Sequence, residues 1–140
     1  MRRGRRIAFD YGDVRIGVAV SDLDSILSSP LCNLRSNDKK LILEIKEILS
    51  EIDPIVIYIG RPKLLRGSDG DSTRKVLEFA ELLKSITQVP IEFVDERLST
   101  ITAARSLRNA GKNAKQSKEI IDMTAAIAIL DFAIELERSK

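Results

Sequence analysis

The stretch from residue 5 to residue 22 reads RRIAFDYGDVRIGVAVSD, and its pattern decides how the fold begins. Arg5–Tyr11 is an apolar run that closes on Asp10 and predicts a buried strand. Gly12-Asp13 is a turn signal, and Arg15–Ser21 then alternates branched with small residues, which predicts a second strand. The short spacing between the two runs indicates an antiparallel hairpin with a carboxylate, that of Asp10, at the end of its first strand.

Beyond this hairpin, strand and helix patterns alternate. The expected elements are a short strand at 30–34, a helix at 39–52 with Asp38 as its N-cap, a strand at 55–59, a loop at 60–71, a helix at 72–86, a strand at 91–94, a short helix from Ser99 to Gly111 and a last helix at 119–137. This order predicts an α/β fold, a single domain over residues 1–140 with a five-stranded mixed sheet flanked by helices.

Composition excludes several classes of protein. The chain has 140 residues, 44% of them hydrophobic, which is enough for one ordinary core. It has no apolar run of about 18 residues, so neither a membrane span nor a membrane partner is expected, and the default location is the cytoplasm. Cys32 is the only cysteine and there is no histidine. A Ser-His-Asp nucleophile, a His-ligated or Cys-ligated zinc site and an intrachain disulfide are therefore excluded.

Carboxylates stand at three places where an apolar strand ends or an apolar helix begins. These are Asp10, the pair Asp95-Glu96, and Asp122. Acids at the ends of buried elements can converge on one point, and clustered carboxylates suit an oxygen-liganded divalent metal and phosphate chemistry. Because neighbours in a strand point to opposite faces, only one of Asp95 and Glu96 is expected to join such a cluster.

Basic residues are concentrated in two segments. No acid occurs between Arg97 and Lys118, a segment that also holds Arg105, Arg108, Lys112 and Lys115. Arg2, Arg3, Arg5 and Arg6 form the second cluster. Both suit a phosphate backbone, although a solvated helix face explains such charges equally simply. Aromatic residues make up only 4%, which favours a structured or duplex nucleic acid over base stacking on single strands.

Arg15 lies in the hairpin beside Asp10. It can contact the scissile strand or pair with Asp13 or Asp22, and the sequence leaves these readings open.

Four motifs in this order resemble the ribonuclease H-like superfamily and, within it, the YqgF-type family. They are residues 9–22, the Gly-Arg-Pro loop at 60–70, Val-Asp-Glu-Arg-Leu-Ser-Thr at 94–100 and Asp-Met-Thr-Ala-Ala at 122–126. Members of that family are described as pre-16S rRNA nucleases and as Holliday-junction-resolvase-like proteins. The resemblance covers nearly the whole chain.

The resemblance implies a metal-dependent endonuclease that processes the 5′ end of pre-16S rRNA with Mg²⁺ or Mn²⁺. Asp10, Glu96 and Asp122 would be the catalytic metal ligands, with Asp95 the less favoured alternative to Glu96. The residues expected to bind nucleic acid are Arg15, Arg97, Arg105, Arg108, Lys112 and Lys115. The loop departs from the family pattern, because Arg66 stands where an acid is usual. An arginine there cannot ligate metal and could instead contact phosphate.

Other functions stay open on the sequence. A Holliday junction resolvase would act on branched DNA as a two-fold dimer, whereas a processing nuclease could be a monomer or a homodimer. A non-catalytic module could bind nucleic acid or a pre-ribosomal particle through the basic segments alone. An actin-like kinase also uses an Asp-x-Gly hairpin, but it needs a second domain around ATP.

Overall fold

The computed structural model describes residues 1–61, 71–95 and 115–139. Its elements are β1 (Arg6–Tyr11), β2 (Arg15–Ser21), β3 (Ser28–Arg35), α1 (Leu41–Ile52), β4 (Val56–Arg61), α2 (Asp71–Ile86), β5 (Ile91–Asp95) and α4 (Lys115–Arg138). The strands form a five-stranded sheet in the order β3-β2-β1-β4-β5. β1, β4 and β5 are parallel, while β2 is antiparallel to both β1 and β3. The predicted hairpin and the predicted mixed α/β sheet are confirmed.

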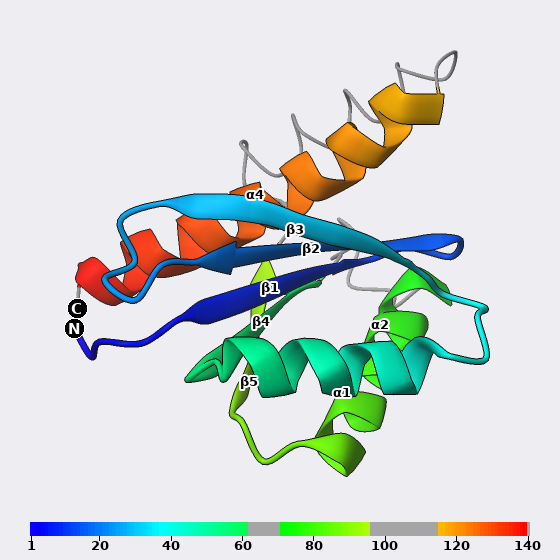
Figure 1. Cartoon of the computed structure of the whole chain (residues 1–140), viewed down its shortest axis with the longest axis horizontal. Coiled ribbons are helices and arrows are strands. Elements are labelled where there is room, and N and C mark those ends of the chain that lie inside the picture. The colour runs from blue at the N-terminus through cyan, green and yellow to red at the C-terminus, as the bar shows by residue number, and fades with distance from the viewer. Residues whose placement is uncertain (62–70, 96–114, 140) are drawn as a thin grey trace.

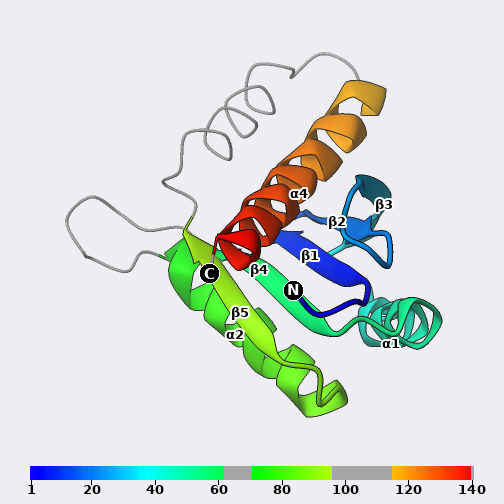
Figure 2. The same cartoon turned by 90° about the vertical axis from the view of Figure 1, so that its left-hand side faces the viewer.

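Helices cover both faces of this sheet. α1 and α2 lie on one face and α4 crosses the other (Figure 1 and Figure 2). Alternation along β1 separates the two cores: Ile7 and Phe9 pack with α1 and α2, whereas Ala8 packs with α4. The α4 face carries small residues, among them Ala8 and Ala19 of the sheet and Ala125 and Ala126 of the helix, all fully buried. Small side chains on both partners let the helix lie close to the strands.

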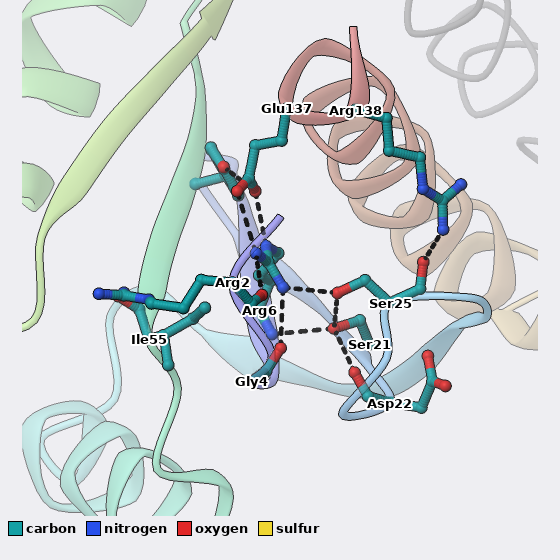
Figure 3. A network of polar contacts seen from close by, with 10 residues as sticks. Arg2, Gly4, Arg6, Ser21, Asp22, Ser25, Ile55, Glu137 and Arg138 are labelled. Atoms are coloured by element: carbon teal, nitrogen blue, oxygen red, sulfur yellow. Dashed lines mark hydrogen bonds and ion pairs between the residues drawn. The ribbon is translucent and has the colours of Figure 1, made fainter. Parts of the chain in front are cut away.

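A buried ionic network joins the start of β1 to the end of α4 (Figure 3). The Arg6 guanidinium is fully buried, and its Nε and Nη2 donate to the two carboxylate oxygens of Glu137 at 2.6 and 3.0 Å. Its Nη1 donates to the carbonyl of Gly4 and to Ser25 Oγ, and the Tyr58 hydroxyl donates to Glu137 at 2.5 Å. Burial and this carboxylate raise the pKa of the Tyr58 phenol.

Some element boundaries differ from those expected. β3 runs over Ser28–Arg35 and is longer than the predicted 30–34, because Pro30 sits on an edge strand where its missing N–H costs little. Asp38 is not the N-cap of α1: the cap position is Lys40, without a side-chain hydrogen bond, and Asp38 Oδ1 accepts from the Lys40 N–H at 2.9 Å. α1 ends where predicted, at Ile52, and its C-cap residue Asp53 adopts a left-handed conformation with φ 49°.

The last helix begins earlier than its apolar pattern suggested. α4 starts at Lys115, so residues 115–118, expected to precede the helix, form its first turn. The predicted short helix from Ser99 to Gly111 lies outside the described residues. Among the helices that the structure describes, none is long and apolar enough to cross a membrane.

Candidate active site

Asp10 lies near the end of the central strand, β1. It is the penultimate residue of β1 and is 1% exposed. It shares the α4 face with Ala8, two residues earlier. Its antiparallel partner on β2 is Gly17, and on β4 the last paired residues, Phe9 and Ile59, place Gly60 beside it. The buried Asp10 carboxylate thus lies between two residues that have no side chain.

Asp122 lies on the helix that covers this face. Glu137, near the end of α4, binds Arg6 at the start of β1, so the earlier turns of α4 lie toward the end of β1 that carries Asp10. Asp122 is about two turns after the start of α4, not in its first turn as predicted. It lies one turn before Ala125 and Ala126, which are buried in the core between α4 and the sheet.

Asp95 belongs to the other face of the sheet. Val94 packs in the α4-side core with Tyr58, so its neighbour Asp95 points toward the side of α1 and α2. The register of β5 agrees, because Asp95 aligns with Arg61 and the Arg61 guanidinium lies 5.7 Å from the ring centre of Phe93, the preceding residue on that face. Asp95 therefore does not share the face of Asp10, and Glu96 lies outside the described residues.

The complete carboxylate cluster stays a prediction. Within the residues that the structure describes, no three carboxylate or thiol side chains gather closely enough to hold a metal. Of the predicted ligands Asp10, Glu96 and Asp122, only Asp10 has a described side chain.

The basic residues divide into three groups. Arg15 is the first residue of β2 and is half-buried, and Lys115 is the first residue of α4. Arg97, Arg105, Arg108 and Lys112, with Arg66 of the loop, lie outside the described residues. The N-terminal cluster is in part structural: Arg6 is buried with Glu137, and Arg3 pairs with Asp24 at 2.9 Å. The prediction that this cluster binds phosphate is therefore wrong for Arg6.

Neighbouring side chains define the surroundings of Arg15 and Tyr11. Asp13 binds Lys75 Nζ at 2.9 Å, and Asp22 accepts the N–H groups of Ile26 and Leu27. Tyr11 packs on Phe79 of α2, with ring centres 5.0 Å apart, on the face opposite Asp10. It is a half-buried strand tyrosine and not part of the site.

Sequence reasoning missed one basic residue near the site. Arg35, exposed at the end of β3, stands directly opposite Arg15 in the sheet register. The expected strand ended at residue 34, so this pairing was not foreseen. The alternation of Cys32 and Leu34 toward the core against Asn33 and Arg35 is the signal that would have extended the strand.

The geometry and the solved structures define a class of protein. The fold resembles Thermus thermophilus RuvC in complex with a Holliday junction substrate, with a TM-score of 0.61 and 14% identity, over 97% of this chain and 96% of that one. Together with the sheet order, this makes the domain ribonuclease H-like.

The family follows from sequence. The RuvX family, described as Holliday junction resolvase, matches residues 4–135, and the chain belongs to it. A relative in Streptomyces coelicolor is 42% identical over 140 residues, covering 99% of this chain and 84% of the relative. One in Cutibacterium acnes is 38% identical over 136 residues, covering 96% and 84%. Both are named "Putative pre-16S rRNA nuclease". The resemblance drawn from the motifs is confirmed, and the protein is a phosphodiester-hydrolysing nuclease.

Proposed function

We propose that this protein is a divalent-metal-dependent endonuclease that processes the 5′ end of precursor 16S rRNA. The observation that carries the proposal is the buried Asp10 carboxylate at the end of the central strand, between Gly17 and Gly60 and beneath the helix that holds Asp122. The names of the relatives support the RNA substrate.

The donors present fit Mg²⁺ or Mn²⁺. Both ions prefer carboxylate oxygens, and this chain has no histidine to favour zinc. Asp10, Glu96 and Asp122 would hold the metal, and Asp10 has a glycine beside it on each neighbouring strand. We leave Asp95 out of this set, because it lies on the opposite face of the sheet. A bound ion would neutralise charge on the scissile phosphate and activate the attacking water.

The polypeptide has to bring a phosphodiester to these carboxylates. Arg15 lies on the Asp10 face of β2, near the same end of the sheet. Arg97, Arg105, Arg108, Lys112 and Lys115 would guide the rest of the backbone, because a guanidinium can donate to two phosphate oxygens at once. The pre-ribosomal particle is the proposed setting for this contact.

Cleavage of branched DNA is the second candidate, favoured by the family description and by the fold shared with a RuvC–junction complex. Symmetric cutting of a four-way junction needs two active sites related by a two-fold axis. A protein that stays monomeric when bound to a junction would therefore not support this candidate.

Cleavage assays test the proposal directly. Wild type, Asp10→Asn and Asp13→Asn are each incubated with a labelled pre-16S 5′-leader RNA and with a four-way DNA junction, in Mn²⁺ or in chelator. Asp13→Asn is the matched control, because Asp13 is an exposed acid of the same hairpin that pairs with Lys75.

We expect Mn²⁺-dependent cleavage of the RNA, lost by at least about 100-fold in Asp10→Asn and kept in Asp13→Asn, since even outer-shell partners of metal ligands contribute 10–100-fold. Cleavage of the junction but not of the RNA would show that the protein acts on branched DNA instead. Binding of either substrate without cleavage, unchanged in Asp10→Asn, would make the protein a binding module.

A further inference from the structure

Two arginines face each other across the β2–β3 ladder. Arg15 and Arg35 are directly paired in the register, and residues directly opposite in an antiparallel ladder point to the same face. The adjacent pair, Ile16 and Leu34, is buried with α1 and α2. Arg15 and Arg35 therefore lie on the other face of the sheet, which is the face of Asp10.

The arginine pair also lies at the same end of the sheet as Asp10. Asp10 pairs with Gly17, and Arg15 is two residues from Gly17 toward the β1–β2 turn. With a rise of about 3.3 Å per residue and strands about 4.8 Å apart, the Cα atom of Arg15 lies ~8 Å from that of Asp10, and the Cα atom of Arg35 lies ~12 Å from it. A row of one acid and two bases thus runs across β1, β2 and β3.

The backbone around this pair is fixed. The Ser36 N–H donates to the Val14 carbonyl at 3.0 Å, and Ser36 Oγ donates to the Gly12 carbonyl at 2.5 Å. These bonds tie the end of β3 to the turn that precedes β2. Within the turn the backbone packs closely, because a Cβ atom added at Gly12 would lie 2.7 Å from the Arg15 carbonyl oxygen. These contacts, made by both strands, fix the register in which the two arginines lie opposite each other.

The charges of this pair suit an anion. Like charges directly opposite one another destabilise a sheet, and an anion bound between them would relieve the repulsion. Arg35 is exposed and forms no ion pair among residues 1–61, 71–95 and 115–139. Two acids of neighbouring segments bind other groups: Asp13, in the turn before β2, binds Lys75, and Asp38 Oδ1 accepts the Lys40 N–H. Two guanidinium forks suit a phosphodiester, which presents several oxygens to bidentate donors.

We propose that Arg15 and Arg35 clamp a phosphate of the substrate strand next to the one cleaved at Asp10. The strand then crosses the sheet on the α4 side from β1 toward β3. In both views α4 rises away from the sheet toward its N-terminal end (Figure 1 and Figure 2), and Arg35 is exposed. The inference rests on the proposed function and extends it by assigning Arg35 and the direction of the bound strand.

Salt-dependent binding tests the clamp independently of cleavage. Dissociation constants for the pre-16S 5′-leader RNA are measured in chelator at several KCl concentrations, for wild type, Arg15→Ala, Arg35→Ala and the double variant. Each lost phosphate contact lowers the slope of log affinity against log salt by about 0.7–0.9. We expect this change in each single variant, about twice the change in the double variant, and binding weakened about tenfold per arginine.

Two further variants sharpen the result. Arg3→Ala/Lys84→Ala removes the same charge from exposed residues away from this end of the sheet, where Arg3 pairs with Asp24 and Lys84 with Glu81, and should keep the wild-type slope. Arg15→Lys/Arg35→Lys should keep the slope but lose affinity, because lysine lacks the bidentate fork.

The outcomes separate this inference from the proposed function. A wild-type slope in Arg15→Ala/Arg35→Ala, with the fold intact by circular dichroism, would overturn the clamp even if the protein cleaves RNA. An equal loss of slope in the Arg3→Ala/Lys84→Ala control would overturn it too, since the effect would then be general charge. Failure of wild type to cleave would overturn the nuclease proposal and leave the binding result standing.

Discussion

A guanidinium fully removed from water is retained only with compensating partners, and Arg6 has a complete set. Glu137 supplies both carboxylate oxygens, Ser25 a hydroxyl, and Gly4 and Arg2 their carbonyls. Taking away one member of such a pair is far more costly than replacing both, because the remaining charge stays buried alone. The pair therefore makes stability sensitive to single changes at either chain end.

We expect Glu137→Ala to lower the free energy of unfolding by about 3–5 kcal/mol, because it leaves the Arg6 charge uncompensated in the interior. Urea unfolding followed by circular dichroism measures the change. Glu135→Ala is the matched control: Glu135 pairs with Arg138 on the surface of the same helix, so its loss should cost less than about 1 kcal/mol. Equal midpoints for the two variants would contradict the buried pair.

Asp22 gives a pH-dependent prediction. Hydrogen bonds from the backbone N–H groups of Leu27 and Ile26 lower the pKa of its carboxyl from the ordinary 3.8. A lowered pKa in the folded state adds stability above the unfolded pKa, and this stability is lost as pH falls through the folded value. Wild type should therefore exceed Asp22→Asn in thermal stability above pH 4, and the difference should shrink as pH falls below 3.8. A difference that stays constant from pH 6 to pH 2 would refute it.

At the residue scale, the sequence predicts the chemical role of a side chain better than it predicts how deeply that side chain is buried. The motif around Asp10 pointed to a carboxylate at a strand end, and the structure places it there. The four N-terminal arginines look alike in the sequence, yet only Arg6 is buried. Strand alternation places Arg6 on the α4 face with Ala8 and Asp10. Its partner Glu137 is 131 residues away in the chain, and no local sequence pattern indicates that the two residues pair.

Among the elements, the β1–β2 hairpin sets the geometry of the candidate site. Gly12 is required there by close approach of backbone, since a Cβ atom at this position would lie 2.7 Å from the Arg15 carbonyl oxygen. Moving that carbonyl would disturb both the Asp10–Gly17 pair of the β1–β2 ladder and the Arg15–Arg35 pair of the β2–β3 ladder, because β2 belongs to both.

Gly12→Ala should destabilise the protein by about 1–3 kcal/mol, the usual cost of forcing an extra methyl group into a packed place. It should also weaken RNA binding by displacing Arg15. Urea unfolding and the chelator binding assay measure the two effects. Val14→Ala is the control, because Val14 belongs to the same turn and its side chain is 59% exposed. Equal stability and affinity for the two variants would show that the turn has room to spare.

Element boundaries were predictable where an apolar period marks them. β2 matches its expected range, and α2 begins one residue from it, because buried faces impose alternation on strands and a stripe on helices. The start of α4 was not predictable in this way. Its first turn, Lys115–Lys118, holds polar residues that form helix readily but carry no apolar signal.

For the whole molecule, metal should be linked to stability. Carboxylates gathered without metal repel one another, and an ion that binds only the folded state stabilises it by about 2.7 kcal/mol at a hundred times its dissociation constant. Saturating Mn²⁺ should raise the melting temperature of wild type by several degrees. Asp10→Asn should lose this response and Asp13→Asn should keep it. A wild-type melting temperature that is the same in Mn²⁺ and in chelator would count against the metal site.

The global arrangement was predictable because hydrophobic order and connection rules allow few sheets for this sequence. A hairpin followed by strand–helix alternation predicted the mixed sheet, with Asp10 near the end of an inner strand. The sequence did not decide how deeply a side chain is buried or on which face of the sheet it lies. The face of Asp95 follows from that of Val94, and recognising Arg35 needed the register of an edge strand.

The bond between Arg6 and Glu137 also has a consequence for how the protein is made. β1 leaves the ribosome early, but α4, which covers its Ala8–Asp10 side and carries the carboxylate that compensates Arg6, follows every strand of the sheet in the chain. The α4-side core therefore cannot close until α4 has been synthesised. A nascent chain stalled before α4 would expose an apolar sheet face and the Arg6 guanidinium without its carboxylate partner.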